Sequence, residues 1–162
     1  MKPTTSMMAI AALSFFAFAQ VANAQMAKDI QGVWKAVEVV VPSGPYTGTH
    51  TTDVQPSLFI FTKSHYSILS VGGFKPRPAL KAAPSSFEEY AAVYGPFTAN
   101  AGTYQVKGTN LTSTPSVAAW PALMSGGATP PLELEWKGAD LWFISTAANG
   151  QVTRVRLTRV DD

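Results

Sequence analysis

The C-terminal stretch at residues 132–160 reads LELEWKGADLWFISTAANGQVTRVRLTRV, and its pattern decides the fold class. Leu132, Leu134 and Trp136 are separated by single glutamates, and such alternation is typical of a strand with one buried face. Asn149-Gly150 is the strongest hairpin signal in the chain. Three antiparallel strands are therefore predicted, at residues 132–136, 141–146 and 152–160.

Residue types that favour strands also occur in the earlier part of the chain. Residues 33–41 are rich in valine and end at Pro42, which cannot continue a ladder of hydrogen bonds. A short helix is predicted between the capping candidates Ser85 and Ser86 and the stop at Gly95-Pro96, because the apolar residues between them have helical spacing. The predicted strands before residue 132 span residues 33–41, 58–62, 65–71, 102–107 and 110–114.

The order of these elements predicts how the sheet closes. About eight short strands with hairpin spacing indicate an all-β, antiparallel fold. Three of them precede the short helix and five follow it, so the first and last strands can meet edge to edge. We therefore expect an up-and-down eight-stranded barrel rather than an open sandwich. Residues 72–84 and 119–131 are rich in Pro and Gly and are expected to be irregular.

The first residues have the three regions of an export signal. Lys2 precedes an apolar stretch at residues 7–19, and Ala22-Asn23-Ala24 has the small residues of a cleavage site. The apolar stretch is too short to span a bilayer, which takes about 20 residues. We therefore expect residues 1–24 to be a signal peptide cleaved after Ala24. Residues 25–162 would then form one barrel domain, exported to the periplasm or secreted.

The composition excludes several function classes. Hydrophobic residues make up 46% of the 162 residues, which is enough for a folded core. The 12 Lys+Arg against 10 Asp+Glu provide no clustered basic surplus of the kind that nucleic-acid binding requires. The absence of cysteine excludes disulfide bonds, thiolate metal sites and a cysteine nucleophile. We expect no nucleic-acid partner and no membrane span, and the oligomeric state is left open.

The start of the first predicted strand carries a family resemblance. Gly32-Val33-Trp34, after Ile30-Gln31, resembles the Gly-x-Trp signature of lipocalins. With Glu88-Glu89-Tyr90, residues 102–106 and the final Leu157-Thr158-Arg159-Val160, the chain is similar to the bacterial lipocalin-like domain family over residues 30–160. The resemblance implies an eight-stranded barrel with a central cavity.

The same resemblance implies a structural role for Gly32, Trp34 and an arginine near the last strand. In such barrels the tryptophan closes one end, and the arginine packs across its ring through a cation–π contact. Alternation along the last strand puts Leu157 and Arg159 on one face and Arg156 on the other. Arg159 is therefore the expected partner of Trp34.

Large side chains on the predicted strands are the candidates for contact with a ligand. An eight-stranded barrel either fills with side chains or holds one small molecule, and aromatic residues serve both purposes. The hydroxyl groups of Tyr66 and Tyr104 would be the polar groups of such a cavity. The candidates are Glu38, Phe59, Phe61, Tyr66, Tyr104, Leu134, Trp136 and Phe143.

Two interpretations of Glu38 stay open. In a regular strand it shares a face with Trp34 and points into the barrel, where a carboxylate needs a tyrosine or arginine partner. A β-bulge would turn it outward. His50, in a threonine-rich segment with Asp53, has no set of spaced metal ligands around it and is expected in a solvated loop. No His follows His65, which argues against haem. No catalytic residue, metal or cofactor is predicted.

We therefore expect an exported barrel that binds a small hydrophobic or amphipathic molecule in its cavity. One alternative is an enzyme of isomerase, cyclase or dehydratase type that uses Glu38 and a tyrosine as acid and base. The other alternative is a filled barrel that contacts a partner protein through residues 72–84 and 119–131. These expectations differ in whether the barrel interior is open.

Overall fold

The structure is a computed structural model that describes residues 29–73, 75–80, 82–126 and 129–160. The predicted signal peptide and its cleavage site lie outside the described residues. The strands and helices of the described residues, in chain order, are β1 Gly32–Ser43, β2 Thr49–Thr51, β3 Ser57–Phe61, β4 His65–Val71, α2 Phe87–Tyr94, β5 Phe97–Lys107, β6 Asn110–Ala118, α3 Ala122–Ser125, β7 Leu132–Lys137, β8 Asp140–Thr146 and β9 Val152–Arg159.

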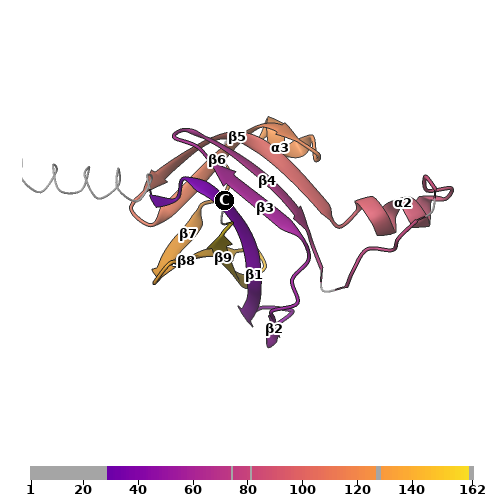
Figure 1. The fold of residues 1–162 in the computed structure, drawn as a ribbon, viewed down its shortest axis with the longest axis horizontal. Coiled ribbons are helices and arrows are strands. Elements are labelled where there is room, and N and C mark those ends of the chain that lie inside the picture. Colours follow the sequence, from indigo (N-terminus) through magenta and orange to yellow (C-terminus); the bar gives the residue numbers. More distant parts are fainter. Residues whose placement is uncertain (1–28, 74, 81, 127–128, 161–162) are drawn as a thin grey trace, which may run out of the picture.

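The strands form a closed antiparallel barrel (Figure 1). From β3 to β9 each strand pairs with the next, and β9 returns to pair with β1. β2 and β3 share one edge of β1, because β2 pairs with residues 39–41 and β3 with residues 32–34. Eight strand positions therefore surround the barrel. This confirms the predicted up-and-down eight-stranded barrel.

Two short elements differ from the predictions. The threonine-rich segment around His50 forms β2 instead of a loop, because the turn at residues 44–48 returns the chain alongside β1. α3 lies within the predicted irregular region 119–131 and contacts β6. Within the described residues β6 pairs with β7 only at Asn110 and Leu111, so the rest of that edge needs other partners. The backbone N–H of Thr129 supplies one by donating to the Ser113 carbonyl group at 2.7 Å.

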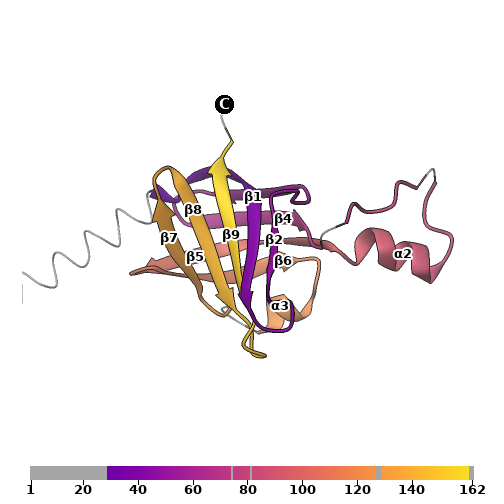
Figure 2. The same cartoon turned by 90° about the horizontal axis from the view of Figure 1, so that it is seen from below.

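The predicted short helix is α2, and it projects away from the barrel (Figures 1 and 2). Ser86 caps it, since its hydroxyl oxygen accepts a hydrogen bond from the backbone N–H of Glu89 at 3.2 Å. The apolar stripe faces solvent, with Phe87 79% exposed and Tyr90 56% exposed. Neither α2 nor α3, the helices of the described part of the chain, is long and apolar enough to cross a membrane.

Candidate functional site

One end of the barrel, which we call the closed end, is sealed around Trp34 at the start of β1. The indole Nε1 of Trp34 donates a hydrogen bond to the Ile30 carbonyl oxygen at 2.8 Å, and both residues are fully buried. The guanidinium carbon of Arg159 lies 4.2 Å from the Trp34 ring centroid. The same guanidinium donates to the carbonyl oxygens of Gln31 and Asp29, at 2.8 and 2.6 Å. The chain before β1 is thereby held across this end by Trp34 and Arg159, the pair that the resemblance implies and strand parity selects.

Aromatic rings fill the closed half of the barrel interior. The Phe61 ring lies 5.3 Å from Tyr104 and 6.0 Å from Phe143, measured between centroids, and both contacts are edge-on. Trp34 and Trp136 meet in the same way at 5.7 Å. Edge-to-face contacts of this kind stabilise a core beyond simple burial of area. The aromatic side chains predicted around a ligand therefore lie mainly against one another.

Tyr66 and Tyr104 belong to this filled half as well. Tyr66 is 3% exposed and Tyr104 is 7% exposed, and burial raises the pKa of both phenol groups. The Tyr104 hydroxyl group donates to the Thr62 carbonyl oxygen at 2.7 Å. Both side chains therefore stay neutral, and they are core residues rather than the polar groups of a cavity.

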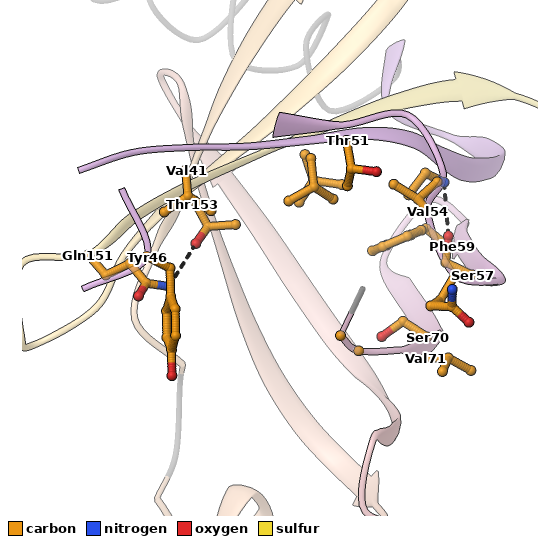
Figure 3. A pocket seen from close by; sticks show the side chains of 16 residues that line it. Val41, Tyr46, Thr51, Val54, Ser57, Phe59, Ser70, Val71, Gln151 and Thr153 are labelled. Carbon is orange, nitrogen blue, oxygen red and sulfur yellow. Dashed lines mark hydrogen bonds between the residues drawn. The ribbon is translucent and has the colours of Figure 1, made fainter. Parts of the chain in front are cut away.

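The opposite half of the barrel, which we call the open end, contains a pocket of about 380 Å³ (Figure 3). Of the predicted ligand-contacting side chains, all of which are described, Phe59 alone lines this open-end pocket. Leu134 is 2% exposed in the core cluster, and Trp136 lines a different cavity together with Arg159. The apolar residues of the open-end pocket on β1, β3, β4 and β9 are Ala36, Val39, Val41, Phe59, Val71 and Val155.

Polar but uncharged side chains complete the lining. Thr51 comes from β2, Ser57 from β3, Ser70 from β4, and Thr153 from β9. The Gln151 side-chain amide donates to the Thr153 hydroxyl group at 3.4 Å, the contact drawn in Figure 3. The remaining lining residues lie in the connections at residues 46, 54–55 and 72–73. Oriented hydrogen-bonding groups among apolar side chains are the usual composition of a small-molecule site.

A β-bulge in β1 determines which side chains reach this pocket. The pairing of β1 with β9 shifts between Ala36 and Glu38, so Ala36, Val39 and Val41 face inward and Glu38 does not. The backbone N–H of Ala36 donates to the Ser57 hydroxyl oxygen at 2.9 Å. Of the two interpretations of Glu38, the structure shows the bulged one.

Glu38 is instead part of a charged cluster on the outer surface of β1 and β9. Its carboxylate accepts from Arg156 Nε at 2.6 Å and lies 2.7 Å from His50 Nε2. Hydrogen bonding from Arg156, and then from His50, lowers the pKa of Glu38 below its ordinary value of 4.5. Arg156 also contacts Asp140 at 3.1 Å. The acid and base that the enzyme alternative requires are therefore not assembled from Glu38 in the pocket.

The outer face of β7, β8 and β9 continues this cluster. Trp142 points outward yet is only 9% exposed, because Lys137 Nζ and the Arg154 guanidinium carbon each lie 5.3 Å from its ring centroid. Glu135 forms ion pairs with both cations. Among the described residues no group of three or more His, Asp or Glu side chains is placed to hold a metal ion. The charged side chains of these strands therefore pair with one another and with Trp142 on the outer surface of the barrel.

The pocket residues that the sequence analysis missed carry a signal that parity would have found. On β9, Val155 and Thr153 follow the same alternation as the buried Leu157. On β3, Ser57 follows the alternation of Phe59 and Phe61. Small inward-facing residues toward one end of a strand therefore indicate the open half. The sequence analysis selected large aromatic residues instead, and these lie in the filled half.

Comparison with known proteins adds little to this geometry. No protein-family profile matches the sequence, and no curated protein matches it. A redesigned β-barrel of known structure is similar at a TM-score of 0.43 and 12% sequence identity, over 83% of this chain and 95% of that chain.

Proposed function

We propose that this protein is an exported, lipocalin-like barrel that binds a small apolar or amphipathic molecule reversibly in the open-end pocket. The observation that carries the proposal is the pocket of about 380 Å³, which lies within the usual size range of small-molecule sites. Its lining is mostly apolar, so ligand burial would contribute about 25 cal/mol per Å² of apolar surface. Trp34 and Arg159 close the opposite end, which supports the lipocalin-like assignment.

The pocket is built into the strands rather than formed by loops alone. Its deep side consists of Ala36, Phe59 and Val155, each of which is next along its strand face to a core residue. Such a wall changes little on binding, so less ordering entropy is lost than with a mobile loop.

Native mass spectrometry of protein purified from an exporting bacterial host, without detergent, tests the binding proposal. We expect a stoichiometric mass excess that disappears on denaturation and that small-molecule extraction identifies. Val155→Trp fills the pocket and should abolish the excess, whereas Val117→Trp adds the same ring at a position 66% exposed on β6 and should keep it. A wild-type mass without any excess, which also does not increase when a library of lipids and aromatic compounds is added, would contradict the proposal.

The same spectrum tests export. We propose that residues 1–24 are removed, because a basic start, an apolar stretch and Ala22-Asn23-Ala24 occur in the order of a signal peptide. The denatured mass should equal that of residues 25–162. A full-length mass in the exported fraction would exclude cleavage after Ala24.

A barrel that acts by contacting a partner protein through residues 72–84 and 119–131 is the second candidate, and exposed aromatic side chains favour it. Phe87 on α2 and Trp120 beside α3 are 79% and 71% exposed. Both lie close to the connections predicted to carry such contacts. If the mass stays bare and Val155→Trp leaves the protein unchanged, this candidate replaces the binding proposal. A ligand that is bound by the wild type and lost on Val155→Trp would favour the binding proposal over this candidate.

A further inference from the structure

We infer that the open-end pocket selects an electrically neutral ligand, such as an alcohol, ester, ketone or amide with an apolar body, and discriminates against carboxylates and amines. This inference rests on the proposed function and names the chemical class that the site takes. Its basis is the distribution of charge across β1 and β9. Among the described residues that line the pocket there is no Asp, Glu, His, Lys or Arg.

The charged side chains of β1 and β9 beside the pocket lie on the outer face of these strands. Glu38, Arg154 and Arg156 alternate with the pocket residues Val39, Thr153 and Val155, so their side chains point away from the interior. They are also already paired, Glu38 with Arg156 and Arg154 with Glu135. A ligand carboxylate or ammonium group inside the pocket would therefore find no counter-charge among the described lining residues.

Burying an ionised group without a partner is costly enough that the group neutralises or stays in water. A carboxylate would bind only in its protonated form or with its charged end outside the barrel. The same argument applies to an ammonium group. A neutral hydrogen-bonding group avoids this cost, provided that the pocket satisfies its donors and acceptors.

The pocket supplies such partners on its outer side. Thr153 and Gln151 follow Val155 toward the open end of β9, and Ser57 follows Phe59 toward the open end of β3. The Ser57 oxygen accepts from the Ala36 N–H, which leaves the Ser57 hydroxyl hydrogen free to donate to a ligand. The geometry therefore places the apolar part of the ligand against Phe59 and Val155, and its neutral polar group between the β3 and β9 hydroxyls.

One basic side chain lies close enough to the opening to require a control. Lys75 does not line the pocket, but it lines an adjoining groove at the base of the segment that carries α2, and this groove shares Gly72 and Gly73 with the pocket. Arg77 in that segment is engaged, because it donates to the Val93 carbonyl oxygen at 3.2 Å and lies over the Phe97 ring. A carboxylate held at the opening by Lys75 would mimic binding inside the pocket.

Displacement of the neutral dye Nile red by decanol, decanoate and decylamine at neutral pH tests the inference on the mature protein, after removal of any co-purified ligand. We expect decanol to bind about tenfold or more tightly than either ion, because only the ions lose solvation without a partner. Thr153→Lys should reverse the order between decanol and decanoate. Thr158→Lys, which adds the same charge on the outer face of β9, should leave the order unchanged.

The outcomes separate the inference from the proposed function. If decanoate or decylamine binds wild-type protein as tightly as decanol, and Val155→Trp abolishes that binding, the ligand class is wrong but the pocket is functional. If decanoate binding depends on Lys75, as shown by its loss in Lys75→Gln, recognition of charge lies outside the barrel and the inference is also overturned. If neither the dye nor any probe binds, the proposed function itself fails.

Discussion

The closed and open ends of the barrel are built from the same strands but have opposite interiors. Along β1 and β9 the closed end has Trp34 and Leu157, both fully buried, whereas the open end has Val39, Val155 and Thr153 around a pocket. β1 and β9 pair along both ends, with register shifts between Ala36 and Glu38 and between Val40 and Ser43. The comparison teaches that the size of the inward-facing side chains, together with the bulge that selects them on β1, divides one barrel into a core and a cavity, since an eight-stranded barrel is just wide enough to be filled.

The largest expected effect is the loss of Trp34, which seals the closed end. Trp34→Ala should lower the free energy of unfolding by about 3–5 kcal/mol, because it leaves a cavity beneath Arg159 and Trp136. Trp120→Ala, at a position 71% exposed, should change it by less than about 0.5 kcal/mol. Urea unfolding measures both. Similar losses in the two variants would show that the closed end is not the stabilising core.

A matched pair on β9 compares the two ends directly. Leu157→Ala should cost about 2–5 kcal/mol because Leu157 is fully buried in the core cluster. Val155→Ala, one step along the same strand face, should cost only about 1 kcal/mol, since it enlarges a space that is already open. The pair is measured by urea unfolding of the ligand-free protein. Equal losses would mean that the pocket is collapsed in solution.

Substitution of Gly32 tests how much the contact of Arg159 with Trp34 stabilises the closed end. Its φ of +129° is strained for any other residue, and a Cβ there would meet Arg159 Nη1. Gly48→Ala is the control, because Gly48 has a φ of +90° but open space around it. We expect about 1–3 kcal/mol of strain in each variant. Gly32→Ala should cost about 1 kcal/mol more, from the cation–π contact that Arg159 loses. If Gly32→Ala costs no more than Gly48→Ala, the contact of Arg159 with Trp34 contributes nothing to stability.

The smallest expected effect concerns the outer charged cluster at Glu38. Its pKa is lowered in the folded state, so the unfolded chain binds more protons on acidification. The ordinary pKa of a glutamate side chain is 4.5. The stabilisation that Glu38 contributes is therefore fully present above pH 4.5 and is lost as the pH falls through the lower pKa of the folded state. Urea unfolding of wild type and Glu38→Gln should differ at neutral pH and converge in acid. The free energy of unfolding of Arg156→Met should converge with that of the wild type in acid in the same way. A difference between variant and wild type that does not change with pH would exclude this linkage.

Much of the barrel could be predicted from local pattern. The alternation of Leu132, Leu134 and Trp136 and the Asn149-Gly150 turn predict strands that the structure contains as β7, β8 and β9. Asn149-Gly150 works because Gly150 adopts a positive φ of 80° that a tight turn requires. Such signals depend on neighbours in the chain, which is why they are readable without tertiary information.

The pocket was missed because the sequence analysis selected large side chains, although strand parity also identifies the small inward-facing residues that line it. Choosing the large aromatics led to Phe61, Tyr104 and Phe143, which fill the closed half. The bulge that turns Glu38 outward is a shift of β1 against β9, a strand more than a hundred residues away. β2 likewise exists only because β1 offers it an edge.

The sequence by itself therefore determined the order of the main strands and the closed antiparallel barrel, and parity selected Arg159 as the partner of Trp34 that the family resemblance implies. The reason is that alternation with a period of two residues assigns each side chain to one face of its strand. Only the tertiary structure decided that the small side chains leave a pocket, which way Glu38 points and that hydroxyl groups from β3 and β9 line the same pocket. Those features depend on register between distant strands and on the summed volume of side chains that meet inside the barrel, and neither quantity is present in any local stretch of the chain.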